Sequence, residues 1–223
     1  MARTLIITGA SSGIGEATAR TAAGRGWNVA LLARSEDKLN RIAGEIGQAV
    51  LPIACDVTDR ASLDGAIEQV VERFGSIDAV YANAGKGVDN PGIEAGDPEE
   101  WHDMIHLNIL AVLHTAHATL PHLRKTKGQF VVTGSKAGRD HMKGSVYGAT
   151  KWFVQGFAGN LAEEMREWGG RCCVITPGMV DTAFFDEPKP GKLKAEDIAE
   201  AVLFALEQSN TASVREIHLM PND

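Results

Sequence analysis

Short apolar runs alternate along the chain with longer segments whose apolar residues recur every three or four positions. Runs of β-branched and aliphatic residues predict strands, and the three-to-four spacing predicts helices. The predicted strands are residues 4–8, 28–33, 49–54, 77–82, 129–135, 171–176 and 214–219. The predicted helices are about 13–25, 36–46, 60–74, 98–123, 145–168 and 195–208.

Most of the early predicted strands are continuous apolar runs, which indicates burial on both faces. This favours a parallel sheet with helices on both sides. Right-handed crossovers between seven such strands predict an α/β fold, a Rossmann-type doubly wound seven-stranded parallel sheet flanked by helices. No Pro/Gly/Ser-rich linker interrupts the pattern, so we expect one domain over residues 1–223. Ligands of such sheets bind outside the carboxyl ends of the strands.

Several helix boundaries have a local cause. Asp59 and Asp97 are predicted N-caps, and Pro98 follows the second of them at the first helical position. Gly75 and Gly169 follow predicted helices at the place where a left-handed C-cap is common.

Composition narrows the classes of protein. With 44% hydrophobic residues and a net charge of −7, the chain is typical of a globular protein and lacks the basic stripe of a nucleic-acid surface. The apolar run at the N-terminus is too short for a signal peptide, and no segment is long enough to span a membrane. Cys55, Cys172 and Cys173 show no C-x-x-C spacing, so we expect buried thiols in a reducing cytoplasm.

The first predicted strand is followed by "TGASSGIG", in which Gly9, Gly13 and Gly15 punctuate a strand-to-helix turn. Glycines let such a turn approach a pyrophosphate, and the helix N-terminus offers N–H groups to the anion. A dinucleotide is the implied ligand. The spacing differs from G-x-G-x-x-G, and a merely tight turn is the alternative interpretation.

The end of the second predicted strand bears on the choice of cofactor. An acidic residue there would bind a ribose 2′-hydroxyl, and an Arg would accept a 2′-phosphate. Ala33 occupies the acidic position and Arg34 follows, so NADP is favoured. In the alternative, Arg34 is solvated and Glu36 or Asp37 takes the ribose, although both acids suit the first turn of a helix.

Polar residues also follow the next two predicted strands. Asp56 is placed to accept a hydrogen bond from an adenine amino group, while Asn83 and Gly85 are expected beneath the cofactor. Ordinary turn chemistry is the alternative for all three, because Asn, Asp and Gly are common at strand exits.

In "SVYGATKW", Tyr147 and Lys151 are four residues apart and therefore share one helix face. A nearby cation favours phenolate, so Lys151 is expected to lower the pKa of Tyr147 and make it a usable proton donor and acceptor. Ser135, at the end of the fifth predicted strand, would hold a substrate oxygen beside the phenol. Ser145 is a predicted N-cap.

Together these motifs resemble the short-chain dehydrogenase/reductases. The resemblance rests on "TGASSGIG", "NAG" (83–85), "LNILA", Ser135 with "YGATK", and "PGMVDT" (177–182), in the family's order over nearly the whole chain. It implies that Tyr147 is the general acid/base, that Ser135 orients the carbonyl or hydroxyl, and that Lys151 also binds the nicotinamide ribose. Asn108 would help to hold a water between the lysine and solvent.

The resemblance also implies an NADP(H) site and a carbonyl or alcohol substrate. The expected cofactor-binding residues are Gly9, Ser11, Ser12, Gly13, Ile14, Gly15, Arg34, Asp56, Val57, Asn83, Ala84, Gly85, Tyr147, Lys151, Pro177, Gly178, Val180 and Thr182. Family members are usually dimers or tetramers built through the helices at 98–123 and 145–168, so a homodimer or homotetramer is expected.

The chain departs from the family at the segment between Thr182 and Ala195, which is short. That segment is the family's substrate lid, so the resemblance implies an open pocket. Besides Ser135, the candidate substrate residues are His141, Met142, Met179, Phe184 and Phe185, with core packing as the alternative; Lys86 and Val88 are candidates for the rim.

Other chemistries receive less support. His102 and His106 have the i, i+4 spacing of helical metal ligands, but no H-E-x-x-H motif accompanies them, so no metal is expected. Ser135 does not stand in a G-x-S-x-G elbow, which disfavours a hydrolase. The alternatives to an NADP-dependent carbonyl reductase are an NADP-binding redox sensor or scaffold without turnover, and an NAD-preferring dehydrogenase of the same family.

Overall fold

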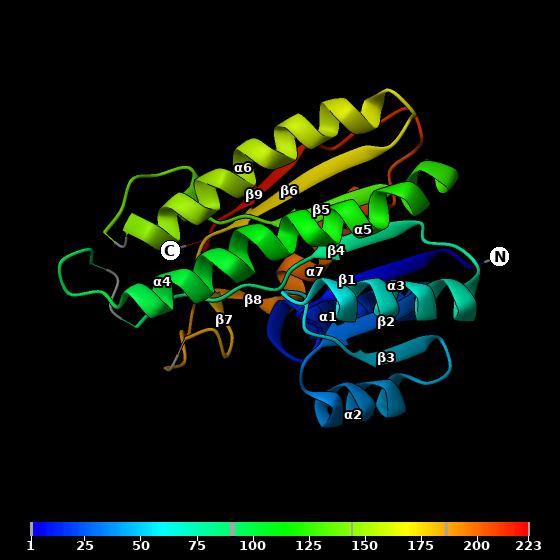
Figure 1. Cartoon of the computed structure of the whole chain (residues 1–223), viewed down its shortest axis with the longest axis horizontal. Helices are drawn as coiled ribbons and strands as arrows, with labels where there is room; N and C mark the ends of the chain where they lie inside the picture. The colour runs from blue at the N-terminus through cyan, green and yellow to red at the C-terminus, as the bar shows by residue number, and fades with distance from the viewer. Residues whose placement is uncertain (1, 90–91, 144, 186, 223) are drawn as a thin grey trace.

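A computed structural model describes residues 2–89, 92–143, 145–185 and 187–222. Seven parallel strands form one sheet in the order β3-β2-β1-β4-β5-β6-β9, which confirms the predicted doubly wound architecture. The strands are β1 (Thr4–Thr8), β2 (Asn28–Ala33), β3 (Val50–Ala54), β4 (Ala79–Ala82), β5 (Gln129–Thr133), β6 (Arg171–Pro177) and β9 (Glu216–Leu219). Figure 1 shows β1 and β4 side by side in the sheet, and the strand order reverses between them. The carboxyl ends of strands at such a reversal are where sheets of this kind bind ligands.

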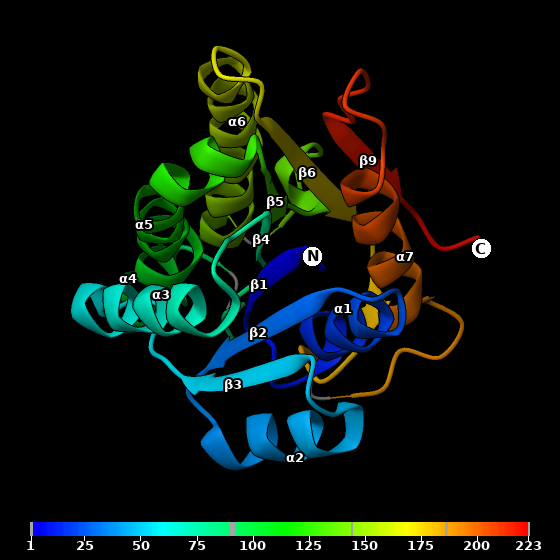
Figure 2. The ribbon, with the colours of Figure 1, turned by 90° about the vertical axis from the view of Figure 1, so that its right-hand side faces the viewer.

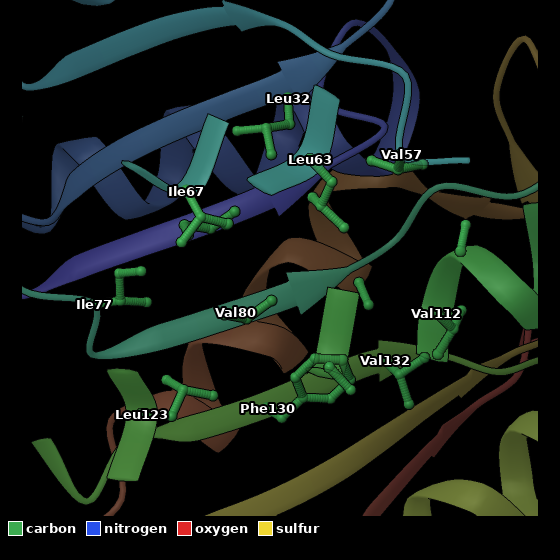
Figure 3. Close-up of a cluster of buried hydrophobic side chains, with 14 of the residues drawn as sticks. Leu32, Val57, Leu63, Ile67, Ile77, Val80, Val112, Leu123, Phe130 and Val132 are labelled. Atoms are coloured by element: carbon green, nitrogen blue, oxygen red, sulfur yellow. The ribbon is translucent and has the colours of Figure 1, made fainter. Parts of the chain in front are cut away.

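Helices cover both faces of the sheet (Figure 2). One face carries α1 (Gly13–Gly24), α2 (Glu36–Ile46) and α7 (Ala195–Leu206), and the other carries α3 (Arg60–Phe74), α5 (Ala111–Thr126) and α6 (Ser145–Arg166). Successive residues of a strand enter opposite cores: Leu5 packs with α1 and α7, whereas Ile6 packs with α3 and α5. Figure 3 shows the second core, in which Leu63 and Ile67 of α3 lie near Val80 and Phe130 of the sheet.

The prediction of one continuous helix at 98–123 is wrong, because the segment contains three elements. The segment consists of α4 (Pro98–Ile105), a π-helical turn (His106–Leu110) and α5, which ends at Thr126. Two short elements were also not predicted: β7 (Val180–Asp181) and β8 (Leu193–Lys194) form a separate two-stranded parallel sheet. A 3₁₀ turn (Lys136–Gly138) follows β5, which ends at Thr133 and not at 135.

The predicted caps that lie in described residues are confirmed. An Asp59 carboxylate oxygen accepts hydrogen bonds from the backbone N–H groups of Ala61 (2.9 Å) and Ser62 (3.4 Å). Asp97 accepts from the Glu99 N–H at 2.9 Å, at the start of α4. Gly75 and Gly169 have φ values of 82° and 80°, in the left-handed region. The Ser145 side chain lies outside the described residues, so its capping role stays a prediction.

The three cysteines are buried, as predicted. Within the described ranges, no helix combines the length and the apolar character needed to cross a bilayer.

Candidate active site

The turn after β1 is close-packed in a way that only glycine allows. Gly9 and Gly13 have φ values of 65° and 54°, which other residues rarely adopt. A Cβ on Gly9 would lie 2.9 Å from Cα of Ala84, and one on Gly15 would lie 2.3 Å from the carbonyl oxygen of Gly9. Steric contacts or backbone conformation therefore explain why glycine is needed at each position if the turn is to come close to a pyrophosphate.

The N-terminus of α1 is open toward the cleft. Ser12 is the N-cap residue but its side chain makes no capping hydrogen bond, in contrast to Asp59 and Asp97 at the starts of α3 and α4. The first-turn acid, Glu16, is bound by Arg20 at 2.7 Å. Uncapped N–H groups and the positive end of the helix dipole fit a pyrophosphate, so the turn is suited to a dinucleotide.

Asn83 joins the ends of three strands. Its Nδ2 donates to the Thr8 carbonyl at 3.2 Å, its backbone N–H donates to Thr8 Oγ1 at 3.0 Å, and its Oδ1 accepts from Thr133 Oγ1 at 3.2 Å. The side chain thus holds β1, β4 and β5 together while it borders the cleft. Sequence reasoning predicted the location and missed this structural role.

Arg34 and Asp56 face the cleft at the ends of β2 and β3. An Asp56 carboxylate oxygen accepts from Thr58 N (2.9 Å) and Thr58 Oγ1 (2.7 Å). These hydrogen bonds, and then the charge of Arg34, hold the pKa of Asp56 below its ordinary value. Asp56 therefore remains an ionised acceptor beside the Arg34 guanidinium, while Glu36 stands in the first turn of α2, as predicted.

Tyr147 and Lys151 share one face of α6, but their electrostatics differ from the prediction. Nζ of Lys151 donates to the Thr133 carbonyl oxygen at 3.0 Å and lies 5.8 Å from the centroid of the Tyr147 ring. Burial raises the pKa of Tyr147, with a hydrogen bond to Ser135 acting in the opposite direction. Burial also lowers the pKa of Lys151, to about 8.

The expected lowering of the Tyr147 pKa by Lys151 is therefore wrong for this structure. The physical reason is that water is removed from both groups, which disfavours phenolate and ammonium alike. The ammonium points to a backbone carbonyl and not to the phenol oxygen. The phenol of Tyr147 is consequently protonated near neutral pH.

Ser135 lies two residues after the end of β5 and beside Tyr147. Its Oγ accepts from the Ala137 N–H at 3.1 Å, inside the 3₁₀ turn, and its hydroxyl is within hydrogen-bonding reach of the Tyr147 side chain. A Cβ on Gly138 would lie 2.5 Å from the Lys151 carbonyl oxygen, so the turn lies directly on α6. This contact fixes Ser135 relative to Tyr147 and Lys151, as the predicted site requires.

Asn108 is buried in the π-helical turn and is already hydrogen-bonded. Its Oδ1 accepts from Lys86 N and its Nδ2 donates to the Lys86 carbonyl, both at 2.9 Å. A third bond joins Nδ2 to Thr150 Oγ1 at 3.2 Å. A Cβ on Gly85 would touch both Asn108 Oδ1 (3.2 Å) and Lys151 Nζ (3.7 Å), so Asn108 stands close to the lysine. The water that it was predicted to hold stays a prediction.

One cleft of about 1260 Å³ connects these groups. It is lined by every predicted site residue except Gly15 and Asn108, which stand behind its wall. The substrate candidates His141, Met142, Met179, Phe184 and Phe185 line it, together with Lys86 and Val88. Sequence reasoning missed Met220 and Pro221, which follow β9 and lie against Gly178; no motif marks this contact.

The short segment after β7 is folded back on itself. Thr182 binds both following phenylalanines, through Oγ1 to Phe184 N (3.4 Å) and through its carbonyl to Phe185 N (3.2 Å). Asp181 accepts from Lys189 N at 2.8 Å. In the part of the chain described here, no three His, Cys, Asp or Glu residues gather as a metal site requires.

Comparisons with known sequences agree with the geometry of the cleft. The family model described as short chain dehydrogenase matches residues 3–192. An uncharacterized oxidoreductase of Staphylococcus epidermidis is 37% identical over 223 residues, covering 97% of this chain and 96% of that protein. An uncharacterized oxidoreductase of Staphylococcus aureus is 37% identical over 222 residues, with the same coverage.

Solved structures give the same result. An alcohol dehydrogenase from the archaeon Thermococcus sibiricus, complexed with 5-hydroxy-NADP, superposes with a TM-score of 0.91 at 37% identity, covering 100% of this chain and 97% of that one. A 3-ketoacyl-(acyl-carrier-protein) reductase from Brucella melitensis, complexed with NADH, has a TM-score of 0.89 at 28% identity and covers 97% and 96%. These neighbours therefore bind nucleotides of both the NADP and the NAD kind.

Proposed function

Because this chain belongs to the short-chain dehydrogenase family and is an oxidoreductase, we propose that it interconverts a carbonyl and a secondary alcohol with NADP(H). The observation that carries the proposal is the convergence of Ser135, Tyr147 and buried Lys151 on one cleft with an uncapped glycine turn. A protein that only binds a nucleotide needs the turn and has no use for a buried proton donor.

Different residues around the cleft would bind different parts of a nicotinamide dinucleotide. When bound, such a cofactor supplies the hydride to a carbonyl carbon or accepts it from an alcohol. The glycine turn and the first turn of α1 would bind its pyrophosphate. Asp56 would accept from the adenine amino group, and Val180 with Thr182 would border the nicotinamide.

Tyr147 would handle the proton. Its raised pKa keeps the phenol protonated near neutral pH, so it donates a hydrogen bond, and then the proton, to the oxygen of a bound carbonyl. The Ser135 hydroxyl would orient the same oxygen. Lys151 stands behind the phenol with a pKa of about 8, so it can take up or release a proton near neutral pH. General acid catalysis of this kind contributes roughly 10²–10⁴-fold in rate.

Replacing Tyr147 by phenylalanine removes the proton donor and keeps the ring. We expect Tyr147→Phe to lower kcat by at least about 100-fold in a panel of carbonyls, read at the nicotinamide absorbance, because the variant lacks the O–H that would protonate the oxygen. NADPH affinity, measured by fluorescence titration, should stay within about threefold.

The matched control is Tyr81→Phe, the same change at the second of the two tyrosines; Tyr81 is buried and does not line the cleft, and its hydroxyl only accepts from Thr133 Oγ1 at 2.8 Å, at the back of the cleft wall. This variant should keep its turnover. Full activity in Tyr147→Phe would contradict the mechanism. A wild type that binds NADPH and reduces no carbonyl would instead support the redox-sensor alternative.

The choice of NADP over NAD rests on Arg34. Its exposed guanidinium borders the cleft at the end of β2, after an alanine where an acid would repel a 2′-phosphate. Within the described ranges it has no carboxylate partner at ion-pair distance, so its donors are available to a phosphate.

We expect Arg34→Ala to weaken NADPH binding by about 10- to 100-fold, the range for hydrogen bonds to a charged group, and to leave NADH binding nearly unchanged. Lys38→Ala is the control for net charge, since Lys38 is exposed on α2 and does not line the cleft. Isothermal titration with both cofactors measures the effect. Equal losses for NADPH and NADH would speak against the phosphate contact and for the NAD-preferring alternative.

A further inference from the structure

Four large apolar side chains are exposed around the mouth of the cleft. Met142, Met179, Phe184 and Met220 are between 41% and 59% exposed, and all four line it. They form what we call the apolar rim. The rim residues come from four separate segments: the loop before α6, the loop after β6, the turn after β7, and the tail after β9. A gathering of exposed apolar groups at one opening is typical of a binding surface.

Phe184 is the rim residue beside the proposed proton donor. Its ring centroid lies 6.1 Å from that of Tyr147, with the planes tilted by 52°. The Phe185 ring packs edge-on against the Phe184 ring, with 5.3 Å between the two centroids. A Cβ on Gly87 would lie 3.4 Å from Cζ of Phe184. The Thr182 hydroxyl accepts from its backbone N–H. The ring is thus held in place next to the position where a carbonyl oxygen would meet Tyr147.

The charged side chains at this end of the cleft are mainly lysines, and two of them have carboxylate partners. Lys86 and Lys136, which line the cleft, are paired with Asp103 (3.7 Å) and Asp140 (3.6 Å), which line it too. Among the described lining residues the one arginine is Arg34, at the cofactor end, so no planar fork is present here for a carboxylate. Lys143 and Lys192 also border the cleft, and an anionic ketone therefore belongs in the test.

Methionine side chains adapt to irregular apolar shapes and make favourable contacts with aromatic rings, and phenylalanine pairs with them in offset or edge-on arrangements. Resting on the carbonyl–alcohol function proposed above, we propose that the cleft takes neutral ketones or secondary alcohols with an aromatic body, and that Phe184 selects them. The apolar rim would cover the aromatic body while the oxygen faces Tyr147 and Ser135.

The test compares three ketones with NADPH: acetophenone, which is aromatic and neutral, acetone, which lacks the ring, and 4-acetylbenzoate, which adds a carboxylate. Wild type should show kcat/KM in the order acetophenone, 4-acetylbenzoate, acetone. Phe184→Ala should lower kcat/KM for acetophenone about 10-fold, as expected for the loss of an aromatic contact, and change that for acetone by less than about twofold. Phe204→Ala, an equally exposed phenylalanine on α7 away from the cleft, should change neither.

The outcomes separate this inference from the proposed function. Equal effects of Phe184→Ala on acetophenone and acetone, or a preference for 4-acetylbenzoate, would overturn the inference while turnover itself upholds the function. If no ketone is reduced, the proposed function fails, and saturation-transfer NMR then decides the inference. Acetophenone signals that weaken in Phe184→Ala would support it, and signals equal in both proteins would overturn it.

Discussion

Lys151 shows how a single residue is placed at the expense of stability. The residue is 6% exposed and its ammonium donates to the Thr133 carbonyl oxygen, and burial lowers its pKa from 10.5 to about 8. Below pH 8 the folded protein carries a poorly solvated charge that the unfolded chain solvates fully. Such a position makes sense for a proton-handling group beside Tyr147, since stability alone would favour an apolar side chain there.

Lys151→Met gives a prediction that separates this stability effect from activity. Between pH 8 and 10.5 the unfolded lysine keeps its proton while the folded one has released it, so unfolding takes up a proton and the free energy of unfolding rises with pH. The pKa change from 10.5 to about 8 corresponds to about 3 kcal/mol. The wild-type minus Lys151→Met difference in unfolding free energy should therefore increase by about 3 kcal/mol from pH 7 to 10.5.

Urea unfolding at a series of pH values measures this difference. Tyrosines and cysteines titrate over the same range, but they are present in both proteins and largely cancel in the comparison. A difference that stays flat across the range would show that Lys151 has an ordinary pKa.

At the scale of elements, local signals predicted most boundaries. α2 and α3 begin and end at the predicted residues. For α3 the cause is local, because Asp59 caps its N-terminus and Gly75, in the left-handed conformation, ends it. The strands β7 and β8 have only two residues each, too few for an alternation of apolar and polar positions to be recognised in the sequence. They form because the chain returns to Val180 at Leu193, a contact made only in the folded molecule.

The π-helical turn between α4 and α5 is the most informative element that periodicity missed. Residues 98–126 keep a helical spacing of apolar positions, so a continuous helix is the natural reading. The turn instead places Asn108 inside, where it binds both backbone groups of Lys86. A π-turn changes the phase of a helix, and such turns are frequent at functional sites.

At the scale of the whole molecule, α5 and α6 form the surface on which we expect a second copy of the chain to pack. They cover the same face of the sheet (Figure 1). Half-buried Phe153 and Phe157 stack one turn apart on α6, at 6.0 Å. The family resemblance predicts that these helices join copies of the chain, and this half-buried aromatic pair supports the proposal.

Gly156 provides a test that leaves the isolated chain intact. A Cβ there meets no atom within 4 Å, so the isolated chain has open space at this exposed position, whereas Gly156→Trp would clash with a second chain packed on α6. We expect light scattering to show a dimer or tetramer for wild type and a smaller species for this variant. Gly44→Trp, at an equally open glycine of α2, should leave the assembly unchanged. A monomeric wild type would contradict the proposal.

The sequence by itself determined the seven-stranded parallel sheet, the glycine turn and the grouping of Ser135, Tyr147 and Lys151. These follow from local signals: apolar runs, caps, and the rule that parallel strands bring their carboxyl ends to one edge. Nearly all of the site residues that it predicted line the cleft, although many other lining residues were not predicted.

Only the tertiary structure decided the electrostatics of the site and the shape of its mouth. The direction in which the pKa of Tyr147 moves depends on how much water burial removes, and burial outweighs the opposing hydrogen bond to Ser135. The apolar rim likewise joins Met142, Phe184 and Met220 from distant parts of the chain. Such contacts depend on long-range packing, which no spacing along the sequence encodes.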